Sequence, residues 1–109
     1  MAQPATNLLL AVVLLGAHFY KSEFDQAIKE FSDAIRLDPK NPNYCFFRGF
    51  AYASKRRLDK AIEDYNQAIK LKPDHAGAYY NRGIANKVLG NNAEAKADMN
   101  KGRELGFQD

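Results

Sequence analysis

Similar residues recur along this chain at a fixed offset of 34 positions, and this repetition restricts the possible folds more than any other feature. Ala27, Ala61 and Ala95 follow one another at this offset. The same offset relates further sets: Phe31, Tyr65 and Met99; Leu37, Leu71 and Leu105; Pro39 and Pro73; Arg48-Gly49 and Arg82-Gly83. A period of this length indicates that one supersecondary unit is repeated and that neighbouring units bury each other's apolar faces.

Each unit is predicted to contain two amphipathic helices. In the segment 58–71 the apolar residues follow the i, i+3, i+4, i+7 spacing that places them on one face of a helix. Small residues such as Gly49 and Gly83 leave room where two helices cross closely, and a larger side chain there would overpack the contact. Each unit is therefore expected to be a helical hairpin.

Capping residues predict where the helices begin. Asn41 followed by Pro42 is typical of a helix start and predicts a helix over 42–55. Asp74 is expected to cap the first helix of the next unit, over 76–89.

The limits of the first unit and the helix ends follow from similar signals. Ser22 resembles the first residue of a capping box, which predicts a turn near Ser22 between helices over 8–21 and 23–37. Gly90 and Gly106 are predicted to end two of the later helices.

The signature residues of the middle unit are Gly49, Tyr52, Ala61, Tyr65, Ala68 and Pro73, and those of the last unit are Tyr79, Gly83, Ala95 and Met99. At this period they resemble the tetratricopeptide repeat. Gly102 stands in the last unit where Ala is usual. Three features depart from the family pattern: Cys45 and Val12 stand where a large aromatic is usual, the first turn is one residue short, and no extra capping helix follows Leu105.

This resemblance implies an all-α, right-handed α-solenoid of three helix–turn–helix units and six helices. The units would cover about 8–40, 41–74 and 75–107, in one domain over 8–109. Residues 1–7 would be an N-terminal extension, either native or a cloning remnant.

The N-terminal segment has an unusual composition. All Lys, Arg, Asp and Glu residues lie after Tyr20, and residues 8–15 form an unbroken apolar run. This run is shorter than the roughly 20 residues that cross a bilayer. It is interpreted as the first helix of the array, because the apolar face of helix 23–37 needs a partner. The alternative is the core of a cleaved signal peptide.

A terminal helix that is apolar on every side is normally covered. One hypothesis is self-association through this helix, with the contact residues Leu9, Leu10, Val13 and Leu14. The other is that the run packs internally on its neighbouring helices. A third possibility is that the chain is a fragment of a longer repeat protein.

In the family, the first helix of each pair lines a concave groove. The resemblance places these candidate binding residues there: Asn43, Phe46, Phe50, Tyr80, Asn81, Ile84 and Lys87. Phe47 is expected in the core. A groove rich in Phe and Tyr favours a peptide or protein segment with apolar or aromatic anchors.

Some relatives hold the carboxylates of chaperone tails with a clamp of Lys, Asn and Arg. Apart from Asn81, the aligned positions here are Val13, Ala17, Phe46, Phe47, Phe50 and Gly77. The sequence therefore lacks this clamp and does not indicate a co-chaperone of that type.

Other functional classes find little support. The single Cys45, expected to be buried, and the widely separated His18 and His75 do not form a metal site. The acid pair Glu63-Asp64 is expected on the exposed side of its helix, so no acid–base pair is indicated. No phosphate loop or nucleophile elbow occurs. An enzyme, a cofactor and a small-molecule substrate are not expected.

The basic cluster Lys55-Arg56-Arg57 with Lys60 is interpreted as a solvated turn, offset by nearby acids. The formal net charge of +3 is far from that of a dedicated nucleic-acid binder, so no nucleic-acid partner is expected, and membrane binding is not favoured. The chain is expected to be a noncatalytic protein-binding scaffold. Its expected location is the cytoplasm, with export as the alternative if the apolar run is a signal peptide.

Overall fold

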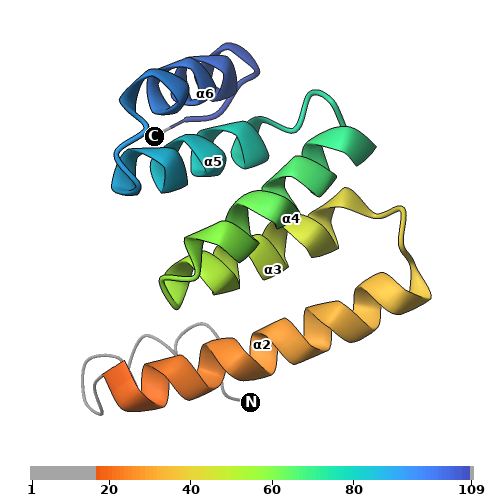
Figure 1. Ribbon diagram of the computed structural model, residues 1–109. Helices are drawn as coiled ribbons and strands as arrows, with labels where there is room; N and C mark the ends of the chain where they lie inside the picture. Colours follow the sequence, from red (N-terminus) through yellow and green to blue (C-terminus); the bar gives the residue numbers. More distant parts are fainter. Residues whose placement is uncertain (1–16, 109) are drawn as a thin grey trace.

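The computed structural model describes residues 17–108, and that range is built from helices and the turns between them. The helices are α2 (Ala17–Leu37), α3 (Pro42–Ser54), α4 (Leu58–Leu71), α5 (Ala76–Val88) and α6 (Asn92–Glu104). Each helix packs against the next one along the chain, and α3 also contacts α5. Figure 1 shows the α3–α4 and α5–α6 hairpins stacked in sequence order beside α2.

The first helix differs from the sequence prediction. α2 runs from Ala17 to Leu37 without interruption, so the predicted turn near Ser22 does not form. No glycine or proline occurs in this helix, and Ser22 lies exposed within it. Serine inside a helix lowers the stability of the helix only slightly. The helix therefore continues through Ser22, which does not cap a new helix. Residues 8–16 of the predicted helix over 8–21 lie outside the described residues.

The helix starts confirm one capping prediction and correct another. The Asn41 side chain accepts a hydrogen bond from the Asn43 amide at 3.0 Å, and Pro42 begins α3 as predicted. At the start of α5, His75 rather than Asp74 is the capping residue, because its Nδ1 accepts a hydrogen bond from the Ala78 amide at 3.1 Å. The sequence pattern does not indicate His75, because histidine is not among the preferred capping residues.

The two later helices end next to the glycines that were predicted to end them. Gly90 follows the last residues of α5 with a φ of 87°, and Gly106 follows α6 with a φ of 112°. Residues with a side chain rarely adopt this conformation, so glycine is favoured at both ends.

Close helix crossings explain two recurring glycines. A Cβ added at Gly49 would lie 2.8 Å from Cε1 of Tyr65. A Cβ added at Gly83 would lie 2.6 Å from Cγ of Met99 and 2.9 Å from the Ala95 carbonyl oxygen. The two helices of each hairpin therefore meet at a glycine, as the spacing predicts. The main buried cluster lies beside the first crossing and consists of Cys45, Ala61, Tyr65, Ala68 and Ala78.

Two arginine–aspartate pairs repeat with the period of the sequence. Arg48 donates to both carboxylate oxygens of Asp64, at 2.9 and 2.8 Å, and Arg82 donates to both oxygens of Asp98, at 2.7 and 2.8 Å. Each pair joins the two helices of one hairpin. Both aspartates are buried, so the prediction that Asp64 lies on an exposed face is wrong.

The same arginines also join neighbouring units. Nη1 of Arg48 donates to Oγ of Ser32 in α2 at 3.1 Å, and Nη1 of Arg82 donates to Oδ1 of Asn66 in α4 at 2.9 Å. Ser32 and Asn66 are themselves one repeat period apart. One guanidinium therefore holds three helices together, which fixes the angle between successive units.

Candidate functional site

Large apolar side chains are exposed on α3 and α5. Phe47 and Phe50 of α3 are 45% and 53% exposed, and Ile84 and Val88 of α5 are 43% and 56% exposed. In contrast, no large apolar side chain of α4 or α6 is exposed, as far as the described residues go. An exposed group of this kind is typical of a binding surface.

Three of these side chains line one hollow of about 230 Å³, which we call the α3–α5 hollow. It lies where α5 packs beside α3 and the start of α4, and its lining residues are Phe50, Ala53, Arg56, Leu58, Tyr65, Asn81, Ile84, Ala85 and Val88. Most of these residues are apolar, and Arg56 is the one charged residue among them. The hollow can therefore bury an apolar side chain.

Polar groups are few in the α3–α5 hollow, and two of them are paired. The phenol of Tyr65 forms a side-chain hydrogen bond with Asn81, which is half-buried. Burial raises the pKa of Tyr65 well above its ordinary value, so the phenol stays neutral. The amide of Asn81 keeps further hydrogen-bonding capacity toward the backbone of a bound segment.

Arg56 holds an unusual backbone conformation at the edge of this hollow. Its φ of 66° makes it the one non-glycine residue with positive φ among the described residues. The equivalent residue of the next hairpin, one period later, is Gly90. An L-residue in this region costs about 1–2 kcal/mol. Such strain is often found at functional sites.

The structure brings together three of the seven predicted groove residues, namely Phe50, Asn81 and Ile84. Asn43, Phe46, Tyr80 and Lys87 do not line the α3–α5 hollow. Asn43 is exposed near the start of α3, and its backbone amide binds the Asn41 cap. The hollow is therefore lined mainly by the C-terminal ends of α3 and α5. Sequence spacing alone does not distinguish these ends from the rest of each helix.

The prediction that Tyr80 faces the groove is wrong. Tyr80 is only 8% exposed, and its ring stacks on Phe107 with centroids 4.2 Å apart. The guanidinium of Arg103, on α6, lies 5.4 Å from the Tyr80 ring centroid. The chain after α6 turns back over α5, and Phe107 covers Tyr80, which the sequence pattern had placed in the groove.

The two neighbouring phenylalanines also differ from expectation. Phe47, predicted to be in the core, is exposed, although its ring lies 5.6 Å from that of Phe31 in α2. Phe46 is half-buried between other rings, with centroid distances of 4.8 Å to His75 and 6.0 Å to Tyr65. Phe46 therefore supports the start of α5 and does not line the α3–α5 hollow.

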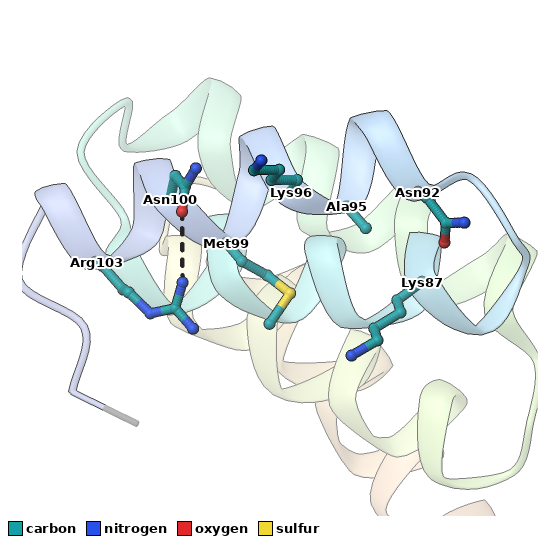
Figure 2. Close-up of a pocket in the computed structure, with 7 residues that line it drawn as sticks. All are labelled: Lys87, Asn92, Ala95, Lys96, Met99, Asn100 and Arg103. Atoms are coloured by element: carbon teal, nitrogen blue, oxygen red, sulfur yellow. Dashed lines mark hydrogen bonds between the residues drawn. The ribbon is translucent and has the colours of Figure 1, made fainter.

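Lys87 belongs to a second hollow, of about 360 Å³, on the far side of the last hairpin. Figure 2 shows Lys87 of α5 on the same side as Asn92 and Met99 of α6, with Arg103 at the other end of α6. Lys87 therefore lines the second hollow and not the predicted groove.

The basic cluster is partly neutralised by a contact that sequence reasoning missed. Lys55 pairs with Asp25 of α2, and the Lys55 side chain is mostly buried. The expected neutralising acids were Asp59, Glu63 and Asp64, which are nearer in sequence. Arg57 and Lys60 are exposed, as a solvated turn requires.

Several predictions concern residues before Ala17. Leu9, Leu10, Val13 and Leu14, named for self-association, lie outside the described residues. Across residues 17–108, no helix is long and apolar enough to cross a membrane. That same part of the chain contains no cluster of His, Cys, Asp or Glu with the makings of a metal site.

No curated protein matches the sequence. Among solved structures, the second TPR of Spaghetti (RPAP3), bound to the HSP90 peptide SRMEEVD, is 30% identical with a TM-score of 0.74, covering 80% of this chain and 81% of that chain. The first TPR of the same protein, bound to the same peptide, is 28% identical with a TM-score of 0.77, covering 94% and 81%.

The Sgt2 TPR domain from Aspergillus fumigatus is 26% identical with a TM-score of 0.76, covering 95% of this chain and 66% of that chain. Family models described as TPR repeat and tetratricopeptide repeat match residues 17–55, 49–90 and 76–105. Together these matches extend over nearly the whole described part, where the paired helices repeat with the period of the sequence. The chain therefore belongs to the tetratricopeptide repeat family.

Proposed function

We propose that this chain is a noncatalytic scaffold that holds a segment of a partner protein in the α3–α5 hollow. The observation that carries the proposal is the convergence of Phe50, Ile84 and Val88, all about half exposed, on one hollow. When a partner covers exposed side chains of this size, the complex is stabilised by about 25 cal/mol per Å² of buried apolar surface.

The hollow also indicates the chemistry of the bound segment. An apolar or aromatic side chain fits against Phe50, Ile84 and Val88, while Asn81 offers hydrogen bonds to peptide backbone. Aromatic anchors in a partly desolvated hollow carry most of the energy at such interfaces. The proposed ligand is therefore a peptide segment with at least one large apolar anchor.

The related domains are bound to a peptide whose C-terminal end is acidic. The two Spaghetti TPR structures contain the HSP90 peptide SRMEEVD. In this chain the described positions that align with the carboxylate clamp of such relatives include Phe46, Phe47, Phe50 and Gly77, none of which carries a charge. Shared architecture supports peptide binding, whereas these residues support an apolar ligand in place of a chaperone tail.

A peptide selection tests this proposal. A random peptide library is selected on the full chain, and the binding of the enriched peptides is measured for Phe50→Ser and Ile84→Ser. We expect the enriched peptides to share a large apolar residue, and each substitution to weaken binding by about 2 kcal/mol, or roughly thirtyfold.

Leu37→Ser is the matched control, because Leu37 is 82% exposed and does not line the hollow. It should leave the affinity unchanged. The proposal fails if no peptides are enriched, if they share no apolar residue, or if all three variants weaken binding equally.

The alternative function is self-assembly through the apolar N-terminal run. Its candidate residues lie outside the described part of the chain, so it rests on the sequence alone. Light scattering over a concentration series distinguishes the two functions. An oligomer that Leu9→Glu and Val13→Glu convert to a monomer supports assembly, and a monomer at every concentration removes this alternative.

A further inference from the structure

The second hollow lies on a face of the last hairpin that we call the α6 stacking face. Its residues, drawn in Figure 2, are Lys87, Asn92, Ala95, Lys96, Met99, Asn100 and Arg103. All of them belong to α5 or α6. This surface is separate from the α3–α5 hollow, with which it shares no residue.

Every residue of the α6 stacking face has an equivalent one period earlier, in the preceding hairpin. Those equivalents are Ala53, Leu58, Ala61, Ile62, Tyr65, Asn66 and Ile69. There α5 packs on α4, Ala61 and Tyr65 are fully buried, and Arg82 of α5 donates a hydrogen bond to Asn66. The α6 stacking face is therefore the surface on which, one unit earlier, a helix packs.

The chemistry of this face has changed while its shape has been kept. Ala95 is buried and Met99 half-buried, so the floor remains apolar. Around that floor, Lys87 replaces the equivalent Ala53, Lys96 replaces Ile62, and Arg103 replaces Ile69. A helix like α5 would bury the charges of Lys87 and Lys96 here.

All the charged residues on the face are positive. Within the described residues, Lys87 and Lys96 have no salt-bridge partner, whereas Lys101, just outside the face, pairs with Glu104 at 3.3 Å. Arg103 donates to Asn100 at 3.4 Å and lies over the Tyr80 ring. A surface that only has to stay hydrated can have both acidic and basic side chains. The exposed face of α2 is an example, because Asp33 pairs there with both Lys29 and Arg36.

We propose that the α6 stacking face docks an α-helix of a partner protein that presents acidic side chains. The helical form follows from the equivalent packing of α5 on α4. The acidic chemistry follows from charge complementarity with Lys87 and Lys96. Small apolar residues of the same helix would rest on Ala95 and Met99. This docking does not depend on a ligand in the α3–α5 hollow.

The probe is an alanine-rich helical peptide of about 15 residues, long enough to be partly helical alone, with glutamates one turn apart along one face. A second peptide has glutamine at each of those positions. Binding to the full chain is measured by fluorescence anisotropy, and the site is located by amide chemical-shift changes. We expect the glutamate peptide to bind at least about tenfold more tightly, with changes centred on Ala95 and Met99.

Lys87→Glu with Lys96→Glu should weaken binding of the glutamate peptide by more than about tenfold. Both side chains are exposed, so the fold should be retained. Lys70→Glu is the matched control, an exposed lysine on α4 without a salt-bridge partner in the described part of the chain and away from either hollow. It should leave binding within about twofold of the unchanged chain.

The proposal is overturned if the two peptides bind equally, if neither binds at millimolar concentration, or if Lys70→Glu weakens binding as much as the double substitution. It is also overturned if the shift changes fall on Phe50 and Ile84, which would place the peptide in the α3–α5 hollow. A doubled mass by light scattering, abolished by the double substitution, would identify a second copy of the chain as the occupant instead.

Discussion

Arg56 shows how a single residue departs from the repeat in which it lies. Its φ of 66° belongs to a region that glycine occupies in the equivalent turn, at Gly90. Its side chain reaches the edge of the α3–α5 hollow, which Leu58 and Val88 also line. The proposed binding in this hollow gives a reason to keep this side chain at a cost in stability.

Arg56→Gly is expected to raise the free energy of unfolding by about 0.5–1 kcal/mol, because relief of strain exceeds the entropy that glycine adds to the unfolded chain. Gly90→Ala is the reciprocal control and should lower it by about 1 kcal/mol. Urea unfolding measures the free energy of unfolding of both variants. Destabilisation by Arg56→Gly would show that the left-handed conformation carries no strain.

The buried aspartates give a second residue-scale prediction. Asp64→Asn leaves the guanidinium of Arg48 without its carboxylate in a site where the Asp64 side chain is only 7% exposed. We expect a loss of about 3 kcal/mol in unfolding free energy. Asp33→Asn, which breaks an exposed pair with Lys29 and Arg36, should cost less than about 1 kcal/mol. Equal losses for the two variants would contradict a structural role for the Arg48–Asp64 pair.

At the scale of the element, the start of α5 depends on a titratable cap. His75 accepts the Ala78 amide through Nδ1, and its ring packs on Phe46. Burial, and secondarily Lys72, lower the pKa of His75 below its ordinary value of 6.5. The folded state therefore binds fewer protons than the unfolded state, and stability rises with pH across this range.

The contribution of the neutral His75 is complete above about pH 6.5 and is lost as the pH falls through its lower folded-state pKa. His75→Asn keeps a capping acceptor that does not titrate in this range. The difference in unfolding free energy between the two proteins should therefore change in favour of the Asn variant between about pH 7.5 and pH 5. Parallel pH profiles would show that the cap is not coupled to protonation.

The elements also show what the sequence could predict. Capping residues and periodic apolar residues predicted the bounds of α3, α4 and α5 to within one residue, because these signals are local. The turn at Ser22 failed because a capping pattern has little weight inside a continuous run of helix formers. Tyr80 and Asp64 were misplaced because their partners, Phe107 and Arg48, are set by tertiary packing.

At the scale of the whole molecule, the two hollows are equivalent places in successive units. Ala53, Leu58 and Tyr65 line the α3–α5 hollow, and their equivalents one period later, Lys87, Asn92 and Met99, line the second. One is bounded by the next helix, whereas the other is open and basic. The repeat spacing predicts this equivalence, but only the three-dimensional arrangement shows which side chains each hollow presents.

The basic residues of the open end should also prevent stacking between copies of the chain. Lys87→Ala with Lys96→Ile restores the equivalents found at Ala53 and Ile62. We expect this variant to self-associate more strongly than the unchanged chain, because a helix-stacking surface is made apolar. Sedimentation velocity over a concentration series measures the effect. An unchanged sedimentation coefficient would show that these lysines do not limit stacking.

Binding of the partner in the α3–α5 hollow can be tested directly by a chemical-shift titration of the full chain with a peptide enriched in the library selection. We expect the amides of Phe50, Asn81, Ile84 and Val88 to shift together, and these shifts to disappear in Ile84→Ser. Shifts confined to α4 and α6, or spread evenly over the chain, would contradict it.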